Sequence, residues 1–231
     1  MIAASDLTAL WISLRLAGLT TVLLLVLCTP LAWWLGTGQS RWRVPVNALV
    51  SLPLVLPPTV LGFYLLVFMG PAGPLGRALH ALGLPSPAFS FEGLVIGSMI
   101  YSLPFAVQPL RDAFEALGTR VLEVAATLRA SPWDRFFSVG VPLASRGFLT
   151  AAVLAFAHTL GEFGVVLMIG GNIPGRTETA SIAIFNHTEA LEYHAANTLS
   201  ATLIVIAFVL LVAVFAASRG RAGTMRPWHL K

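Results

Sequence analysis

Apolar residues dominate the chain in five long stretches, which polar segments separate. A helix that crosses a bilayer needs about 20 mostly apolar residues to cover about 30 Å of hydrocarbon. Each stretch reaches that length, so the pattern predicts an all-α membrane protein with five transmembrane helices. The predicted spans are residues 10–35, 45–69, 91–110, 147–169 and 199–217.

The composition supports this class and disfavours others. Of the 231 residues, 57% are hydrophobic and only 10% are charged, whereas soluble domains have about 25% charged residues. A soluble enzyme and a nucleic-acid binder are therefore disfavoured, despite a net charge of +4. The single cysteine, Cys28, excludes an intramolecular disulfide, and no cluster of cysteine and histidine has metal-ligand spacing.

The distribution of basic residues predicts the orientation, because cytoplasmic loops of membrane proteins are enriched in lysine and arginine. Three segments that fall on one side of the predicted spans hold Arg41, Arg43, Arg111, Arg120, Arg129, Arg135, Arg146, Arg219, Arg221, Arg226 and Lys231. The opposite side holds only Arg77 and Arg176. We therefore predict the N-terminus outside, the C-terminus inside, and a cytoplasmic tail over residues 218–231.

Several catalytic motifs are missing from the sequence. A phosphate-binding P-loop needs a lysine after its glycines, and the only lysine is Lys231, the last residue. Neither the H-E-x-x-H pair of metalloproteases nor the G-x-S-x-G turn of serine hydrolases is present. We therefore expect that the chain is not an enzyme and binds no cofactor, and that any energy source lies on another protein.

The cytoplasmic loop 111–146 mixes charged and aromatic residues. It predicts a helix over 121–129 and a second over 132–139, with Ser131 as N-cap and Pro132 at the first helical position. Trp133, Phe136 and Phe137 would give the second helix an aromatic surface. Two short helices on this side form either a docking element for a partner or a helix that lies on lipid, and periodicity does not choose between them.

Two predicted spans contain residues that are unusual in a membrane. Pro53, Pro57 and Pro58 each remove a backbone donor, so the second span is either a bent helix that lines a pathway or a kinked packing helix. Glu162 is a carboxylate within the fourth span, which favours a functional role. The alternative is a local hydrogen bond near the outer end. His158 could pair with Glu162 across one helical turn.

Three motifs resemble one family. The segment Glu123-Val-Ala125-Ala126-Thr-Leu-Arg129-Ala-Ser131, followed by Phe136-Phe137 and Val141-Pro142, resembles the EAA loop of ABC-importer permeases. Residues 52–70 resemble the second-span signature of molybdate permeases, and residues 160–164 with 171–179 are similar to their fourth span and the loop after it. The resemblance covers about residues 8–217 and implies the type I importer permease fold over that range, with cytoplasmic coupling helices in loop 111–146.

The resemblance assigns residues to two roles. The ATPase-coupling loop would use Glu123, Ala125, Ala126, Arg129, Ser131, Pro132, Trp133, Phe136 and Pro142. Candidates for the translocation pathway or its gate are Pro57, Pro58, Thr59, Gly62, Gly161, Glu162 and Gly164. The chain departs from the family where Arg129 replaces the usual glycine and Val141-Pro142 replaces Leu-Pro. Glycine relaxes such a turn, so Arg129 is expected to affect its geometry.

The same resemblance implies an assembly and a cargo. It implies a homodimer of this chain in the bacterial inner membrane, two copies of a cytoplasmic ATPase that bind ATP and Mg²⁺, and a periplasmic oxyanion-binding protein. Molybdate is the favoured cargo, and tungstate and sulfate or thiosulfate are the alternatives. From other classes, an ATPase-independent channel or scaffold and a membrane-embedded enzyme are the remaining hypotheses.

Overall fold

The computed structural model describes residues 3–222, without the side chains of Thr119 and of residues 217–222. Every regular element within residues 3–222 is helical, as the sequence predicts. The elements in chain order are α1 (Ala4–Thr37), α2 (Arg43–Ser51), η1 (Leu52–Leu54), α3 (Pro58–Met69), α4 (Pro74–Ala81), α5 (Phe91–Glu115), α6 (Gly118–Thr127), α7 (Pro132–Asp134), η2 (Arg135–Gly140), α8 (Val141–Leu143), α9 (Ser145–Gly161), α10 (Gly164–Gly170), α11 (Ala180–Glu189) and α12 (Tyr193–Ala222).

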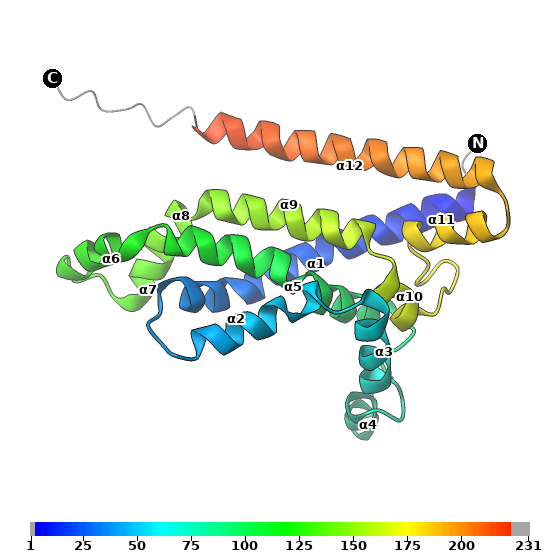
Figure 1. Cartoon of the computed structure of the whole chain (residues 1–231), viewed down its shortest axis with the longest axis horizontal. Coiled ribbons are helices and arrows are strands. Elements are labelled where there is room, and N and C mark those ends of the chain that lie inside the picture. The colour runs from blue at the N-terminus through cyan, green and yellow to red at the C-terminus, as the bar shows by residue number, and fades with distance from the viewer. Residues whose placement is uncertain (1–2, 223–231) are drawn as a thin grey trace.

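The core lies where α1, α5 and α9 pack along one another (Figure 1). Small residues let these helices approach closely: a β-carbon on Gly147 of α9 would lie 2.3 Å from the Ala113 β-carbon of α5. Leu24, Leu110 and Phe114 are fully buried between them. Close packing of small residues is the usual route to helix association in lipid, where apolar surface gains nothing from leaving water.

Four helical stretches in the described chain are long and apolar enough to cross a membrane: Ala4–Thr37, Pro58–Ala81, Phe91–Glu115 and Tyr193–Ala216. A bent pair, Pro132–Leu143 with Ser145–Gly161, passes the same test at an angle of 68°. The first, third and fifth predicted spans therefore correspond to continuous helices α1, α5 and α12. Each of these helices is longer than the predicted span.

The second predicted span, residues 45–69, is not one helix. It consists of α2, the single 3-10 turn η1, and α3, which starts at Pro58. Pro57 has an extended ψ of 136°, so the helical path breaks directly before α3. The prolines cause this break because each lacks an N–H donor and disfavours helical geometry at the residue before it.

The fourth predicted span, residues 147–169, is also wrong as a continuous helix. Helix α9 ends at Gly161, Glu162 is extended with ψ of 139°, and α10 begins at Gly164. The short α10 packs on α3 and α5 and lies apart from the line of α9 (Figure 1). The length of the apolar stretch does not reveal this break, because the residues on both sides of Glu162 are apolar or glycine.

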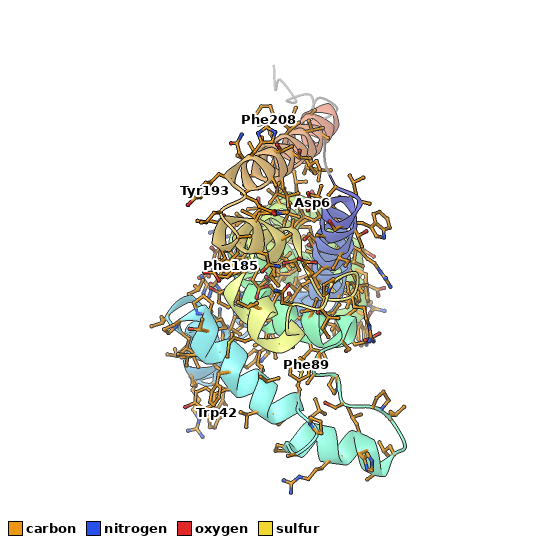
Figure 2. All side chains as sticks on the ribbon, turned by 90° about the vertical axis from the view of Figure 1, so that its right-hand side faces the viewer. Asp6, Trp42, Phe89, Phe185, Tyr193 and Phe208 are labelled. Carbon is orange, nitrogen blue, oxygen red and sulfur yellow. The ribbon has the colours of Figure 1, made fainter. Side chains whose placement is uncertain are left out.

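The predicted cytoplasmic and external segments lie at opposite ends of the bundle. In Figure 1, α6, α7 and α8 lie at one end, together with the turn between α1 and α2, while α11 and the N-terminus lie at the other. The segment between α3 and α5, which falls on the predicted external side, contains the short helix α4. Figure 2 shows α12, labelled at Phe208, on one side of the bundle and α3 with α4 projecting from the other. Of the predicted tail 218–231, residues 223–231 lie outside the described residues.

Candidate functional site

A cavity of about 550 Å³, whose lining is mostly apolar with a few polar side chains, lies beside the break between α9 and α10. Five of the predicted pathway residues line it: Pro58, Thr59, Gly161, Glu162 and Gly164. Tyr101, Ala157, His158 and Phe163 complete the lining. The cavity therefore joins three elements that the sequence separates widely, namely the start of α3, the middle of α5 and the end of α9. Pro57 and Gly62 lie outside the lining.

Glu162 is buried at this break, with 5% of its surface exposed. Both of its carboxylate oxygens are buried without a hydrogen-bond partner, and so is the Ser98 hydroxyl of α5. The Ser98 hydroxyl is the side chain that approaches this carboxylate, and it comes from α5 rather than from the Glu162 segment itself. An unpaired buried carboxylate is costly, so this residue is held in place by the surrounding packing rather than by a bond of its own.

His158 does not pair with Glu162, contrary to the hypothesis from their spacing. Its Nδ1 lies 2.9 Å from the Ser102 hydroxyl, which in turn lies 2.9 Å from the Thr159 hydroxyl. The imidazole stacks on Phe105 at a centroid distance of 4.0 Å. The pairing fails because α9 ends at Gly161, so Glu162 leaves the helical path that would have placed it one turn from His158.

The glycines around the cavity have different roles. A β-carbon on Gly164 would lie 2.7 Å from the Pro58 β-carbon, and one on Gly62 would lie 2.8 Å from the Met168 β-carbon. These two glycines let α3 and α10 pack closely. A β-carbon added to Gly161 would meet no atom within 4 Å. Close packing therefore explains the glycine at position 164 and does not explain the one at position 161.

At the other end of the bundle, Ser131 starts the second half of the predicted coupling loop as expected. Its hydroxyl accepts a hydrogen bond from the Asp134 backbone N–H, and the Asp134 carboxylate accepts one from the Ser131 N–H. This reciprocal pair is a capping box, with Pro132 at the first helical position. The predicted helix over 132–139 is confirmed as part of a continuous helical path from Pro132 to Leu143, in which Arg135–Gly140 is π-helical.

The aromatic residues of this loop divide into an exposed pair and an anchor. Trp133 and Phe137 are 72% and 60% exposed and stack on each other with an interplanar angle of 13°. Phe136 turns inward instead, and its ring contacts Trp33 of α1 at a centroid distance of 5.3 Å. The prediction of one aromatic surface is therefore wrong for Phe136, which fixes the loop to the α1–α5 core.

The first half of the loop, α6, ends at Thr127, two residues before the predicted end. Ala125 is buried, whereas Glu123 and Ala126 are exposed, as is Pro142 in α8. Arg129 follows α6 with a φ of 60°. That left-handed conformation is unfavourable for a residue with a β-carbon and neutral for glycine. Glycine would therefore fit the backbone at position 129 better than arginine does. This agrees with the expectation that Arg129 affects the turn.

Replacing Arg129 by glycine is expected to stabilise this turn by about 1 kcal/mol, because glycine removes the steric cost of the left-handed backbone. The Ala130 N–H donates to the Ala125 carbonyl across the turn, so its hydrogen exchange should slow by roughly fivefold. Arg129→Ala keeps the β-carbon and removes the guanidinium, and should show no slowing. Equal slowing in both variants would assign the effect to the guanidinium instead.

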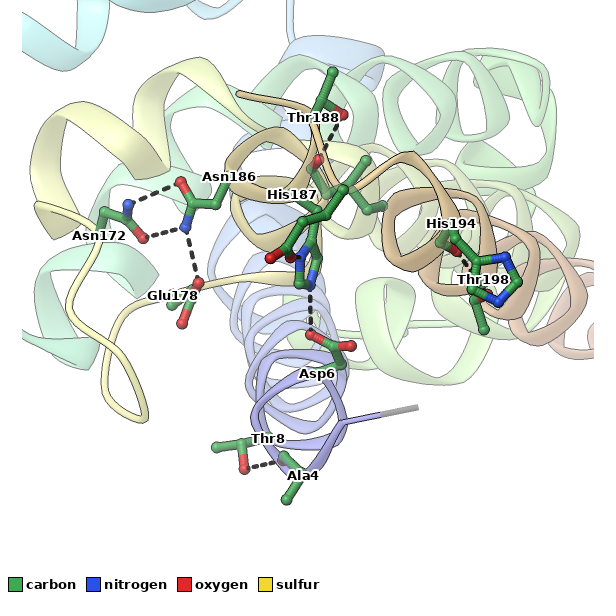
Figure 3. A network of polar contacts seen from close by, with 12 residues as sticks. Ala4, Asp6, Thr8, Asn172, Glu178, Asn186, His187, Thr188, His194 and Thr198 are labelled. Atoms are coloured by element: carbon green, nitrogen blue, oxygen red, sulfur yellow. Dashed lines mark hydrogen bonds and ion pairs between the residues drawn. The ribbon is translucent and has the colours of Figure 1, made fainter. Parts of the chain in front are cut away.

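The predicted external end is held by the network in Figure 3, which links α1, α11 and the loop after α10. Asn172 and Asn186 donate to each other's side-chain oxygens at 3.0 and 3.1 Å. His187 contacts Asp6 through Nε2 at 3.0 Å and Glu192 through Nδ1 at 2.8 Å. Both ring nitrogens face carboxylates, and only the protonated ring can donate from both.

These contacts predict a pH dependence. Hydrogen bonds to Asp6, and then to Glu192, raise the pKa of His187 above its usual value. The stabilisation is therefore complete below about pH 6.5, the usual pKa of histidine, and is lost as pH rises through the raised pKa. Proteolysis of residues 180–192 should accelerate between pH 6 and pH 8 in the wild type and show no such change in His187→Gln. His194→Gln, a matched exposed histidine, should retain the dependence.

Sequence reasoning missed three residues of these sites. The sequence suggests that Trp33, like Trp34 and Trp42, is an ordinary anchor at the membrane interface. In the structure, the Trp33 ring contacts both Phe136 and Phe114. Tyr101 and Ser98 lie in the third apolar stretch, where they are polar residues in a membrane helix. That polarity is the signal that could have identified them.

Comparison with known proteins places the chain in a family. Residues 14–220 match the family described as binding-protein-dependent transport system inner membrane component. The chain is 59% identical over 218 residues to the molybdenum transport system permease protein ModB of Azotobacter vinelandii, covering 94% of this chain and 96% of that protein. It is 34% identical over 219 residues to the protein of the same name from Escherichia coli K12, covering 93% and 96%.

Solved structures agree on the fold. A bacterial ABC transporter that imports the acidic polysaccharide alginate superimposes with a TM-score of 0.79 at 17% sequence identity, covering 94% of this chain and 80% of that chain. The inward-facing MetNI methionine ABC transporter superimposes with a TM-score of 0.73 at 16% identity, covering 92% and 94%. The all-helical architecture is thus the fold of ABC importer permeases, and the chain belongs to the family of binding-protein-dependent transport system inner membrane components.

Proposed function

We propose that the chain is the membrane-spanning permease subunit of an ATP-driven importer that moves molybdate into the cell. The observation that carries this proposal is the 59% identity, over 94% of the chain, to a protein named as a molybdenum permease. The geometry supports it, because a cavity with a few polar side chains borders the break between α9 and α10, and the exposed loop of α6, α7 and α8 lies at the other end of the bundle (Figure 1). Such a subunit needs a translocation pathway and a surface that docks to the ATPase.

The cavity beside Glu162 forms part of the translocation pathway in this proposal. Neither Thr59 nor Tyr101 is charged, so they can pass an oxyanion without holding it tightly. Glu162 would repel an anion, and we assign it to the gate rather than to a binding site. Its unpaired oxygens fit a residue that finds hydrogen-bond donors only after α10 moves relative to α9. The break between Gly161 and Gly164 would act as the hinge for that movement.

The coupling loop seats in a separate ATPase in this proposal. Trp133 and Phe137 form a stacked, exposed aromatic pair, and exposed aromatic residues commonly dominate the binding energy of interfaces. Phe136 and Trp33 connect this pair to the α1–α5 core, so a displacement of the loop reaches the bundle through packed rings. ATP and Mg²⁺ bind to the partner ATPase, and this chain hydrolyses nothing.

The assembly consists of two copies of this chain, two copies of the ATPase and a periplasmic oxyanion-binding protein. One solved relative, the alginate transporter, is described in complex with a periplasmic protein that binds an alginate pentasaccharide, which supports delivery from outside. The chain lies in the bacterial inner membrane with five spans, the N-terminus outside and loop 111–146 in the cytoplasm. The segregation of basic loops to one end of the bundle supports this orientation.

The cargo alternatives are tungstate and sulfate or thiosulfate. The sulfate transport system permease protein CysT of Escherichia coli K12 is 30% identical over 184 residues, covering 80% of this chain and 66% of that protein. That identity is about half of the identity to the molybdenum permease of Azotobacter vinelandii, so molybdate is favoured. An ATPase-independent channel is disfavoured, because it would not require a docking surface such as the exposed Trp133–Phe137 pair.

Competition in proteoliposomes tests the cargo. The chain is reconstituted with its cognate ATPase and binding protein, and uptake of radiolabelled molybdate is measured with excess unlabelled oxyanions. We expect unlabelled molybdate and tungstate to suppress uptake and sulfate to leave it unchanged. Suppression by sulfate at equal concentration would assign the chain to sulfate import.

A further inference from the structure

A second pocket, of about 350 Å³, is lined by residues of elements that meet at the end of the bundle opposite α11 (Figure 1). It is formed where the end of α1, the start of α2 and the end of α5 meet. Its polar lining consists of Gln39, Ser40, Arg43, Asn47, Arg111 and Glu115. The interpretations of the coupling loop and of the pathway use none of these residues.

Asn47 is fixed in one orientation within this pocket. Its side-chain oxygen accepts hydrogen bonds from Arg111 Nη1 at 2.8 Å and from Gln108 Nε2 at 3.3 Å. Because the oxygen is engaged by two donors, the amide nitrogen is the group that remains for a ligand, and it carries two hydrogens. Gln108 is itself held by a bond to the Ser51 hydroxyl at 2.8 Å, so the orientation is set on two helices.

Arg43 supplies the main charge. Its Nη1 donates to the Gly38 carbonyl, which folds the side chain back over the turn between α1 and α2. Its Nε is buried and has no hydrogen-bond partner. A guanidinium presents five N–H donors in a planar fork that matches the oxygens of phosphate-like anions, and a buried donor without an acceptor is destabilising. The Arg43 Nε–H is therefore a donor that a bound ligand could satisfy.

The charges around the pocket favour an anion of moderate affinity. Arg43 and Arg111 face one lining carboxylate, Glu115. The second carboxylate nearby, Asp112, is outside the lining and is 62% exposed where it pairs with Arg111, so solvent screens that pair. Glu115 repels an anion and so weakens its binding. Removing the Glu115 charge should therefore tighten binding, whereas removing an arginine should weaken it.

We propose that this pocket binds a tetrahedral oxyanion through the Arg43 guanidinium and the Asn47 amide, with Arg111 as the second positive charge. Two sources share that chemistry: a free oxyanion at the cytoplasmic end of the bundle, and the phosphate of an anionic lipid headgroup. The exposed Trp42 beside Arg43 is 61% exposed and is compatible with either source. The proposal goes beyond the transport function, since binding needs no ATPase.

The test uses the full-length chain in lipid nanodiscs without partners. In one arm the discs contain only phosphatidylcholine, and binding of radiolabelled molybdate is measured. In the other arm the discs contain phosphatidylcholine and phosphatidylglycerol, and retained phosphatidylglycerol is counted by native mass spectrometry. Signal in the first arm identifies a free oxyanion, and signal in the second alone identifies a lipid phosphate. Either result supports the pocket if the variants below behave as expected.

Four variants decide the outcome. Arg43→Ala is expected to weaken binding at least tenfold, and Arg41→Ala, an exposed arginine two positions away, is the matched control and should bind as the wild type does. Asn47→Asp keeps the side-chain size and the bond to Arg111 while adding a negative charge, so it should also abolish binding without unfolding the chain. Glu115→Gln should tighten binding about threefold.

Equal losses in Arg41→Ala and Arg43→Ala would overturn the proposal, since they would show attraction to diffuse surface charge. Absence of binding in both arms would overturn it as well. Neither result would bear on molybdate transport, which is measured with the ATPase and the binding protein present.

Discussion

Replacing Trp133 by alanine is expected to release the chain from its ATPase and to reduce ATP-driven uptake about 30-fold or more. An aromatic residue at the centre of an interface typically contributes 2 kcal/mol or more when truncated. Trp133 is 72% exposed in the isolated chain and stacks on Phe137 without supporting the core. Its loss should therefore weaken docking while the helices remain folded, and copurification with the ATPase measures this directly.

Trp42→Ala is the matched control for that experiment. Trp42 is another exposed tryptophan, 61% accessible, in the predicted cytoplasmic turn between α1 and α2. It should leave both copurification and uptake unchanged. Phe136→Ala is expected to act differently, lowering thermal stability, because Phe136 packs on Trp33. Unchanged association in Trp133→Ala would contradict the docking assignment.

The second large effect is expected from filling the cavity beside Glu162. Thr59→Trp places an indole at the wall of the 550 Å³ space beside Glu162, and a bulky apolar group in place of a hydroxyl obstructs a pathway by its size. Uptake should fall about tenfold or more, while association with the ATPase should stay normal because the cavity lies far from the coupling loop (Figure 1).

Val60→Trp provides the comparison, because Val60 is the next residue on α3 and does not line the cavity. It should preserve uptake. A loss of uptake in Val60→Trp equal to that in Thr59→Trp would mean that α3 tolerates no indole at all. A normal rate in Thr59→Trp would exclude the cavity from the pathway.

Local chemistry made some features predictable from the sequence. Ser131 before Pro132 determines a helix start by itself, and the capping box with Asp134 follows from the three-residue spacing. The resemblance places Arg129 where the family usually has glycine, so an effect on the turn is expected, and the structure gives this residue a φ of 60°. The spans α1, α5 and α12 follow from apolar length because each is a continuous helix.

Features that depend on distant contacts could not be predicted. Nothing near Phe136 in the sequence distinguishes it from Phe137, and only the presence of Trp33 about 100 residues earlier turns it inward. The helix break at Glu162 also depends on a distant contact. Gly164 packs closely against Pro58 of α3, and this contact holds α10 against α3, apart from α9. The cavity exists only because these long-range contacts separate the two helices.

The most direct test of the account is ATP-dependent molybdate accumulation in proteoliposomes that contain this chain, its cognate ATPase and its binding protein. The account predicts accumulation that requires all three proteins and hydrolysable ATP, and that Trp133→Ala abolishes while Trp42→Ala does not. Accumulation that persists without the ATPase, or without ATP, would contradict the central claim and indicate a passive channel.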